Sequence, residues 1–180
     1  MSRPAPGPIR VVLLVGMMGV GKSSVGRATA RLLGWPYLDN DDQVRGLAGV
    51  ASPEVASTLG IEELHRLERA ALDAVLAHPG PLVASAAGSV VDDVAWREKP
   101  RQDDVLVAWL RARPETLLAR VGAGASRRTD ARSATWTEAT LARREPAFAA
   151  AADLVLDVDE QAVDECAAAL VALIDGRGRG

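Results

Sequence analysis

Short apolar runs alternate along the chain with longer segments in which apolar residues recur at helical spacing. Three of the short runs are almost continuously apolar, as expected for parallel strands that helices cover on both faces. This alternation predicts an α/β fold of three layers, with a five-stranded parallel sheet between helices. The expected strands are Arg10–Val15, Pro36–Asp39, Leu82–Ser85, Val105–Leu110 and Leu154–Val158, and the expected helices are Lys22–Leu33, Ile61–Ala77, Pro114–Val121, Trp136–Ala150 and Glu160–Ile174.

The same pattern predicts one domain, because neither an internal repeat nor a linker divides the 180 residues. We expect residues 1–8 to be flexible, residues 9–174 to form the domain and residues 175–180 to be disordered. Residues 122–134 (GAGASRRTDARSA) lack a periodic apolar face, so we expect a mobile surface segment there that acts as a lid.

Composition narrows the class of protein. Hydrophobic residues make up 48% of the chain, which excludes intrinsic disorder, and the net charge of -3 gives no indication of nucleic-acid binding. The single Cys166 cannot form an internal disulfide, which fits a reducing cytoplasm. No apolar run approaches the ~20 residues of a membrane span, and MSRPAPGPIR lacks the apolar segment of a signal peptide. We therefore expect a cytoplasmic monomer with neither nucleic acid nor membrane as a partner.

The sequence GMMGVGKS, residues 16–23, matches the phosphate-binding pattern G-x-x-x-x-G-K-[ST] between an expected strand and an expected helix. Glycines let consecutive backbone N–H groups point inward, and the following helix adds N-terminal donors and a positive dipole end. Lys22 would reach the β- and γ-phosphates, and the Ser23 hydroxyl would bind Mg²⁺. An ordinary glycine turn is the alternative, which the complete pattern disfavours. The residues expected to bind ATP here are Gly16, Gly19, Val20, Gly21, Lys22, Ser23 and Ser24.

The sequence YLDNDDQV places Asp39 and Asp41 at the end of a short expected strand, where parallel sheets present their functional groups. One carboxylate would help to hold hydrated Mg²⁺, and the other would orient a substrate hydroxyl or accept its proton. Asp42 suits the N-cap of a following helix. A solvated acidic turn is the alternative interpretation, which the preceding phosphate loop weakens.

Arginines gather around the expected lid. Arg120 ends a helix, Arg127 and Arg128 lie in the lid, and Arg143 and Arg144 lie on the next helix. Arginines on a closing loop neutralise charge that develops on a transferred phosphoryl group and help to exclude water. Isolated surface arginines are usually only solvated, so their grouping around one segment is what indicates function.

With these motifs in this order, the chain resembles shikimate kinase, a family of small P-loop kinases with the nucleoside-monophosphate-kinase-like fold. The resemblance covers Ile9 to Ile174 and is especially close over MGVGKSSVGR. It implies ATP as co-substrate, Mg²⁺ as cofactor and a small hydroxylated metabolite as acceptor. It also implies that Asp39 lies with Ser23 near the metal, while Asp41 binds the substrate hydroxyls beside the reacting one.

The resemblance further implies roles for three arginines and for the loop after the last strand. The family's adenine- and phosphate-contacting arginines correspond to Arg120 and Arg127. Its R-x-P-x-[YF] segment, whose arginine binds the substrate carboxylate, corresponds to REPAF, so that role falls to Arg144. The loop from Asp157 to Ala162 would lie along the adenine. The implied catalytic residues are Lys22, Asp41 and Arg127.

The chain departs from the family pattern in the lid and at the acceptor end. In the lid, the family's R-P pair is here Arg127-Arg128. The family's G-G-G, whose backbone approaches the substrate, is here Ala86-Ala87-Gly88. The added methyl groups narrow that space, and an alanine at positive φ would be strained by about 1 kcal/mol or more.

A further departure concerns the helix that faces the acceptor. The family's F-R-x-x-E is here LHRLE, so His65 stands where an arginine makes a second contact to the substrate carboxylate. Losing that contact weakens carboxylate binding by about 1.5–3 kcal/mol. Arg66 projects about 100° away on the helix and is not assumed to substitute. A half-buried histidine without a functional role is the alternative for His65. The expected acceptor residues are Asp41, His65, Ala87, Gly88 and Arg144.

These observations predict an ATP- and Mg²⁺-dependent kinase that phosphorylates a hydroxyl of a small molecule, with shikimate as the best single acceptor. A relative that phosphorylates another cyclic polyol or hydroxylated metabolite is one alternative, because the acceptor end departs from the family. A nucleotide-binding module without transfer activity is another. The presence of all four of Lys22, Ser23, Asp39 and Asp41 disfavours it. A nucleoside-monophosphate kinase proper fits least, because no base-reading pattern accompanies the shared loop.

Overall fold

The computed structural model describes residues 8–98, 102–123 and 133–177. A parallel sheet of five strands lies at its centre, in the order β2-β3-β1-β4-β5. The five-stranded parallel sheet that the hydrophobic pattern predicts is therefore confirmed. The strands are β1 (Val11–Val15), β2 (Tyr37–Leu38), β3 (Leu82–Ser85), β4 (Val105–Arg111) and β5 (Leu154–Asp157).

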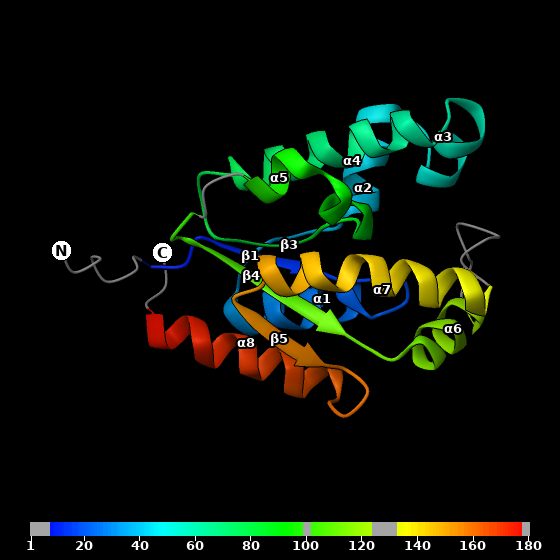
Figure 1. Cartoon of the computed structure of the whole chain (residues 1–180). Helices are drawn as coiled ribbons and strands as arrows, with labels where there is room; N and C mark the ends of the chain where they lie inside the picture. Colours follow the sequence, from blue (N-terminus) through cyan, green and yellow to red (C-terminus); the bar gives the residue numbers. More distant parts are fainter. Residues whose placement is uncertain (1–7, 99–101, 124–132, 178–180) are drawn as a thin grey trace.

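Helices cover the sheet and complete the three layers. They are α1 (Lys22–Leu33), α2 (Asn40–Ala48), α3 (Ser52–Thr58), α4 (Ile61–Leu76), the short 3-10 helix η1 (Gly88–Asp92), α5 (Val94–Glu98), α6 (Pro114–Ala123), α7 (Ala134–Ala151) and α8 (Val163–Arg177). Helices α1 and α8 pack against each other, and α7 packs against β4 and η1. In Figure 1 the sheet lies between α8, below it, and the group of α2 to α5, above it.

The hydrophobic residues form one large core and one small one. Strand β1 is buried along its whole length, and Trp109 of β4 stacks on Phe148 of α7 with the ring centroids 5.7 Å apart. The small core joins α2, α3 and α4 through Val44, Val55 and residues of α4. The helices that carry the acceptor-side residues thus have apolar packing of their own, beside the main core.

The structure corrects several boundaries. The helices α3, η1 and α5 were not expected, and α2 was anticipated only as a helix following Asp42. Asp42 is not an N-cap, because α2 begins earlier and the Asp39 side chain caps it by accepting a hydrogen bond from the Asp41 amide. The last helix begins at Val163 rather than at Glu160. It continues to Arg177, so the first part of the expected disordered tail is helical.

The expected lid is only partly within the described residues. Its first two positions end α6, Ser133 caps α7, and α7 begins at Ala134. Residues 124–132, with Arg127 and Arg128, lie outside the described residues, as do residues 1–7 and 178–180. Ile9, where the domain is expected to begin, is fully buried.

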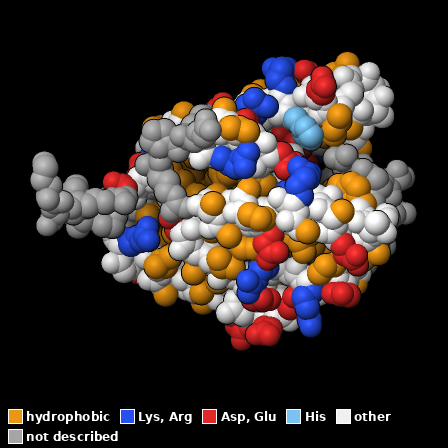
Figure 2. Space-filling model, viewed as in Figure 1, with side chains coloured by type: hydrophobic (Ala, Val, Ile, Leu, Met, Phe, Trp, Pro, Cys, Tyr) orange, Lys and Arg blue, Asp and Glu red, His pale blue; other side chains and the backbone are white. Residues whose placement is uncertain are grey.

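The surface carries charges of both signs. Figure 2 shows acidic and basic side chains interspersed over one face rather than gathered into a single charged patch, in keeping with the net charge of -3. Among the helices that the structure describes, none has the length and apolar character needed to span a bilayer.

Candidate active site

The phosphate loop, residues 16–23, connects β1 to α1 and needs glycine at two positions for steric reasons. Gly16 has φ +143°, and a Cβ there would lie 2.5 Å from the Leu110 carbonyl oxygen of β4. Gly19 has φ +82°, and a Cβ there would lie 2.7 Å from a methyl carbon of Val121 in α6. The loop is therefore packed tightly against β4 and α6, which fixes its curl beside the N-terminus of α1.

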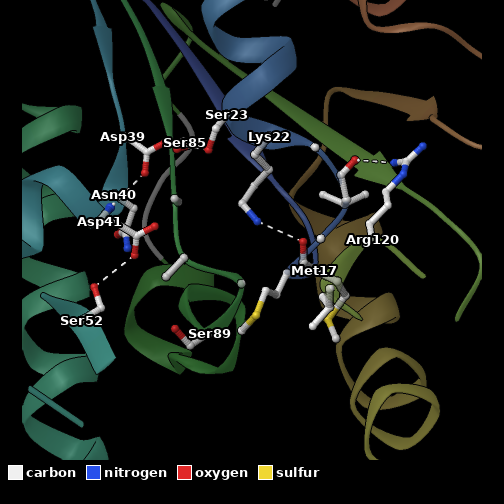
Figure 3. Close-up of a pocket in the computed structure, with 18 of the residues that line it drawn as sticks. Met17, Lys22, Ser23, Asp39, Asn40, Asp41, Ser52, Ser85, Ser89 and Arg120 are labelled. Carbon is white, nitrogen blue, oxygen red and sulfur yellow. Dashed lines mark hydrogen bonds between the residues drawn. The ribbon is translucent and has the colours of Figure 1, made fainter. Parts of the chain in front are cut away.

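Lys22 crosses the inside of this loop. Its Nζ donates hydrogen bonds to the carbonyl oxygens of Gly16, at 2.9 Å, and Met17, at 3.0 Å (Figure 3). The ammonium group thus lies within the curl that the glycines form. This is where the pattern places a cation for phosphate oxygens.

Asp39 is the centre of a hydrogen-bond network between the phosphate loop and the sheet. Its Oδ2 accepts a hydrogen bond from the Ser23 hydroxyl at 2.6 Å and another from the Tyr37 hydroxyl at 3.0 Å. Its Oδ1 accepts from the Asp41 amide at 3.1 Å. The two residues that the sequence analysis expects near Mg²⁺, Ser23 and Asp39, are therefore in direct contact.

Tyr37 supports this carboxylate, and the sequence interpretation missed it. Its hydroxyl also lies 2.9 Å from the Ser85 hydroxyl on the neighbouring strand β3. Burial, together with the nearby charge of Asp39, raises the pKa of Tyr37 to about 12, so the phenol stays protonated and donates to the carboxylate. Tyr37 and Asp39 are two positions apart in an extended segment, which puts them on the same side. That spacing was the available signal.

The oxygen atoms of Ser23 and Asp39 suit Mg²⁺, which prefers carboxylate, hydroxyl and water oxygens. The residues that the structure describes contain no group of three or more His, Cys, Asp or Glu side chains arranged to hold a metal. A magnesium ion here would accordingly take most of its ligands from nucleotide phosphates and water, as is usual for this metal.

Asp41 lies on the acceptor side of the same network. Its Oδ1 accepts a hydrogen bond from the Ser52 hydroxyl at 3.0 Å, at the start of α3 (Figure 3). Ser52 was not anticipated, because α3 itself was not expected. The contact fixes one carboxylate oxygen of Asp41 beside the pocket.

Helix α4 presents His65 and Glu68 to the pocket, while Arg66 points away. His65 is half-buried in the pocket lining. Arg66 is exposed and pairs with Glu63 at 2.6 Å, which agrees with its expected direction. Glu68 is buried and accepts a hydrogen bond from the Ser89 hydroxyl of η1. Of the two candidate residues on this helix, His65 is the one that lines the pocket.

The two alanines that replace glycines are accommodated without strain. Among the described residues, only glycines have a positive φ, and Ala87 has φ -61° and ψ 146°. The Ala86 amide donates to the Leu14 carbonyl oxygen at 3.0 Å. Gly88 differs, because a Cβ there would lie 3.0 Å from the Gly16 carbonyl oxygen. The retained glycine is therefore the one that packs directly on the phosphate loop.

Arg144 is buried on α7 and faces both the pocket and η1. Its Nε and Nη2 donate to the Asp92 carboxylate, with the shortest distance 2.6 Å. Its Nη1 lies 4.0 Å from the Met17 sulfur and on the side of Gly88. Arg143, which is exposed, donates to the same carboxylate at 2.7 Å. Neither Asp92 nor this pairing was anticipated.

Arg120 joins the phosphate loop to the loop after β5. Its Nη1 donates to the Val20 carbonyl oxygen and its Nη2 to the Val158 carbonyl oxygen, both at 3.2 Å. Val158 and Gln161, from the loop expected along the adenine, line the pocket beside it. Cys166 lies near them but is fully buried, and burial raises the pKa of its thiol.

One pocket of about 620 Å³ brings the two halves of the candidate site together. Of the expected site residues, Gly16 shapes the loop without lining the pocket, and Arg127 lies outside the described residues. The expected residues that line it are Gly19, Val20, Gly21, Lys22, Ser23, Ser24, Asp39, Asp41, His65, Ala87, Gly88, Arg120 and Arg144. Lining residues that the sequence interpretation did not anticipate are Asn40, Ser52, Ser85, Ser89 and Trp136.

Known proteins resemble this chain over most of its length. The shikimate kinase family model matches residues 18–175. A shikimate kinase of Moorella thermoacetica is 36% identical over 149 residues, which cover 82% of this chain and 84% of that protein. A shikimate kinase of Symbiobacterium thermophilum is 31% identical over 171 residues, 93% of this chain and 97% of that protein.

Solved structures show the same fold. A shikimate kinase from Acinetobacter baumannii in complex with shikimate has a TM-score of 0.83 at 24% identity, and the match covers 93% of this chain and 94% of that chain. A shikimate kinase from Bacteroides thetaiotaomicron has a TM-score of 0.80 at 22% identity over 92% and 98%. With the family model matching most of the sequence, this chain belongs to the shikimate kinase family of small-molecule kinases, which phosphorylate a hydroxyl group with ATP as co-substrate.

Proposed function

We propose that this protein transfers the γ-phosphoryl group of ATP to a hydroxyl of shikimate, giving shikimate 3-phosphate and ADP. One observation carries the proposal. Gly88 packs between the phosphate loop and the acceptor-side arginine, since its Cβ position lies 3.0 Å from the Gly16 carbonyl oxygen and 3.5 Å from Arg144 Nη1. A single glycine thus separates the groups proposed to hold the phosphates from the group proposed to hold the acceptor's carboxylate.

At the phosphate end, Lys22 and the backbone donors from Gly19 to Ser24 bind the β- and γ-phosphates. Ser23 and Asp39 would hold Mg²⁺, directly and through water respectively. The metal would supply positive charge that offsets the charge developing on the transferred phosphoryl group. The hydrogen bond from Ser23 to Asp39, 2.6 Å long, keeps both oxygen donors at the mouth of the loop.

At the acceptor end, Asp41 positions the reacting hydroxyl and takes its proton. The hydrogen bond from Ser52 fixes one of its carboxylate oxygens beside the pocket. Arg144 binds the carboxylate of shikimate, and His65 donates a hydrogen bond in place of the family's second arginine. Ala87 and Gly88 form the wall between the two ends.

Arg120 and Arg127 complete the nucleotide side. Arg120 contacts the adenine and fixes the phosphate loop through the Val20 carbonyl oxygen. Arg127, whose role comes from the family resemblance, closes over the phosphates and stabilises charge on the transferred group. Most of the rate enhancement then comes from positioning and electrostatics rather than from covalent catalysis. We expect a monomer to be active, because the described residues of one chain supply both ends of the pocket.

The test is a coupled assay of ADP release with shikimate and a panel of other cyclic polyols. We expect turnover with shikimate at a millimolar or lower KM. Lys22→Ala should abolish transfer while the protein stays folded, whereas Arg31→Ala, at an exposed position outside the pocket, should behave as wild type. If Lys22→Ala kept more than about a tenth of the wild-type kcat, the phosphate role of Lys22 would be wrong.

The same assay separates the competing functions. Efficient turnover of a different polyol, with none of shikimate, would favour a kinase of another hydroxylated metabolite. The presence of His65 in place of the family's arginine points to this outcome. Binding of ATP with Mg²⁺ but no turnover of any acceptor would favour a nucleotide-binding module.

A further inference from the structure

Asp92, at the end of η1, lies between two arginines of α7. It accepts three hydrogen bonds from Arg144, two of them from Nε at 3.2 and 3.0 Å and one from Nη2 at 2.6 Å. Arg143 donates to the same carboxylate, to Oδ1 at 2.7 Å and to Oδ2 at 3.4 Å. Asp92 does not line the pocket, whereas Arg144 does. The carboxylate therefore acts on the pocket only through Arg144.

The contact uses one edge of the Arg144 guanidinium and leaves another edge facing the pocket. A guanidinium offers five N–H donors in a rigid plane, arranged as a side edge of Nε and Nη2 and an end edge of Nη1 and Nη2. Asp92 occupies the side edge. Nη1 lies on the pocket side, 4.0 Å from the Met17 sulfur and 3.5 Å from the Cβ position of Gly88. The end edge can therefore bind an acceptor carboxylate with two donors while the side edge stays fixed.

Charges around Asp92 leave the group of Arg143, Asp92 and Arg144 with a net positive charge. Burial alone would raise the pKa of the Asp92 carboxyl, but the hydrogen bonds and charge of Arg144 and the charge of Arg143 hold this pKa below its ordinary value. Asp92 is thus ionised at neutral pH. One negative charge between two positive charges leaves a net charge of about +1 for the group. Arg143 offsets the charge of Asp92 that would otherwise weaken the attraction of Arg144 for an anion.

We propose that Asp92 is a positioning residue that fixes the orientation of Arg144 toward the carboxylate of the acceptor, and that Arg143 acts through Asp92. This inference rests on the proposed function of Arg144 as the carboxylate-binding residue. Without Asp92, the guanidinium loses its three hydrogen bonds on the side edge and rotates among several conformers. The acceptor then has to order the arginine on binding, which weakens binding of a carboxylated acceptor.

The same short helix also sets the distance between the arginine and the wall of the pocket. Helix η1 begins at Gly88, beside Arg144 Nη1, and ends at Asp92, which holds the other edge of the guanidinium. Both contacts therefore move together with η1. For this reason, the carboxylate of Asp92 can determine how the guanidinium of Arg144 is oriented toward the acceptor.

The experiment measures KM, kcat and the calorimetric Kd of shikimate for wild type, Asp92→Ala, Asp92→Asn, Arg143→Ala and the double variant. Asp92→Ala should raise the KM and Kd of shikimate about tenfold, and Arg143→Ala about threefold, with the KM of ATP unchanged. The double variant should match Asp92→Ala alone, because Arg143 acts through Asp92. With the neutral carboxamide of shikimate, the variants should bind as the wild type does, since the effect depends on the acceptor's carboxylate.

Asp93→Ala is the matched control. Asp93 is the next residue along the chain and pairs with Arg69 at 3.0 Å, outside the pocket. Its removal breaks an ion pair of the same kind and should leave the Kd of shikimate unchanged. If Asp92→Ala fails to fold, Asp92→Asn keeps the shape and removes the charge, and it should raise the Kd in the same direction.

The outcomes separate this inference from the proposed function. A wild-type protein that binds shikimate without phosphorylating it would overturn the proposed activity and still allow the Kd comparison. A Kd that stays within twofold of wild type in both Asp92 variants would overturn the role of Asp92. A lower Kd in those variants would do the same, because it would show that the carboxylate repels the acceptor rather than orienting Arg144. Equal losses with shikimate and with its carboxamide would reduce Asp92 to a structural role.

Discussion

The substitution Tyr37→Phe removes one hydroxyl that connects the sheet with the candidate metal-binding carboxylate. The hydroxyl lies 3.0 Å from Asp39 Oδ2 and 2.9 Å from the Ser85 hydroxyl. Asp39 is 7% exposed and Ser85 is 4% exposed, so water has little access to replace the lost contact. The ring itself keeps its close packing on Gly26, because phenylalanine has the same shape.

The expected loss follows from the kind of hydrogen bond. A hydrogen bond to a charged acceptor contributes about 1.5–3 kcal/mol net, so the free energy of unfolding should fall by about that amount. Because the pKa of Tyr37 is raised to about 12, the hydroxyl donates throughout the neutral range and the loss should not vary between pH 6 and pH 9 or so. Asp39 keeps its bonds to Ser23 and to the Asp41 amide. Mg²⁺-dependent binding of ADP should therefore weaken about three- to tenfold rather than disappear.

Urea unfolding and calorimetric titration with ADP, with and without Mg²⁺, measure the two effects. Ser85→Ala is the matched control, because it removes the other partner of the phenol and leaves the contact to Asp39. It should lower stability while leaving the effect of Mg²⁺ on ADP binding as in wild type. If Tyr37→Phe unfolds at the wild-type urea concentration and shows the wild-type effect of Mg²⁺, Tyr37 does not support Asp39 and the reasoning is wrong.

Three further predictions concern the acceptor end. His65→Arg should lower the KM of shikimate about tenfold by restoring a charge-assisted contact, and an unchanged KM would count against placing His65 at the acceptor. Gly88→Ala should lower kcat/KM about tenfold or more, because its Cβ would lie 3.0 Å from the Gly16 carbonyl oxygen, whereas Gly46→Ala, with open space around its Cβ, should have no such effect. The lowered pKa of Asp92 means that its ion pairs stabilise the fold fully above the unfolded-state pKa and less as the pH falls through the folded-state pKa. The difference in unfolding free energy between wild type and Asp92→Asn should thus be constant above about pH 5 and shrink below about pH 4, and a difference that grows on acidification would contradict it.

The fold was predictable where one element is long enough to show its own period. Helix Lys22–Leu33 and strand Leu82–Ser85 have the bounds that the hydrophobic pattern predicts. Helices α3, η1 and α5 were missed because each spans at most seven residues, too few for a helical repeat to stand out. The misplaced N-cap at Asp42 has a related cause, since each of four consecutive polar residues, 39–42, could cap a helix.

The candidate site was predictable where its residues are contiguous in sequence. Residues 16–23 form a local motif whose spacing alone specifies an anion-binding curl. Asp92 could not be found in this way, because it lies 52 residues before Arg144 and nothing in the sequence marks the two as neighbours. Whether Ala86 and Ala87 are strained could not be judged from the sequence either, because strain depends on their backbone dihedrals. In the structure these dihedrals lie outside the positive-φ region that strains alanine.

The resting position of Lys22 bears on how quickly the protein can exchange its nucleotides. Two carbonyl oxygens, 2.9 and 3.0 Å away, already accept hydrogen bonds from the ammonium group. When a nucleotide binds, its phosphate oxygens replace these good hydrogen-bond acceptors with somewhat better ones. The lysine then contributes a small difference to ground-state affinity, and its full electrostatic effect appears only as negative charge builds up during transfer. ADP can leave because the carbonyl oxygens of Gly16 and Met17 can again accept hydrogen bonds from the ammonium group of Lys22.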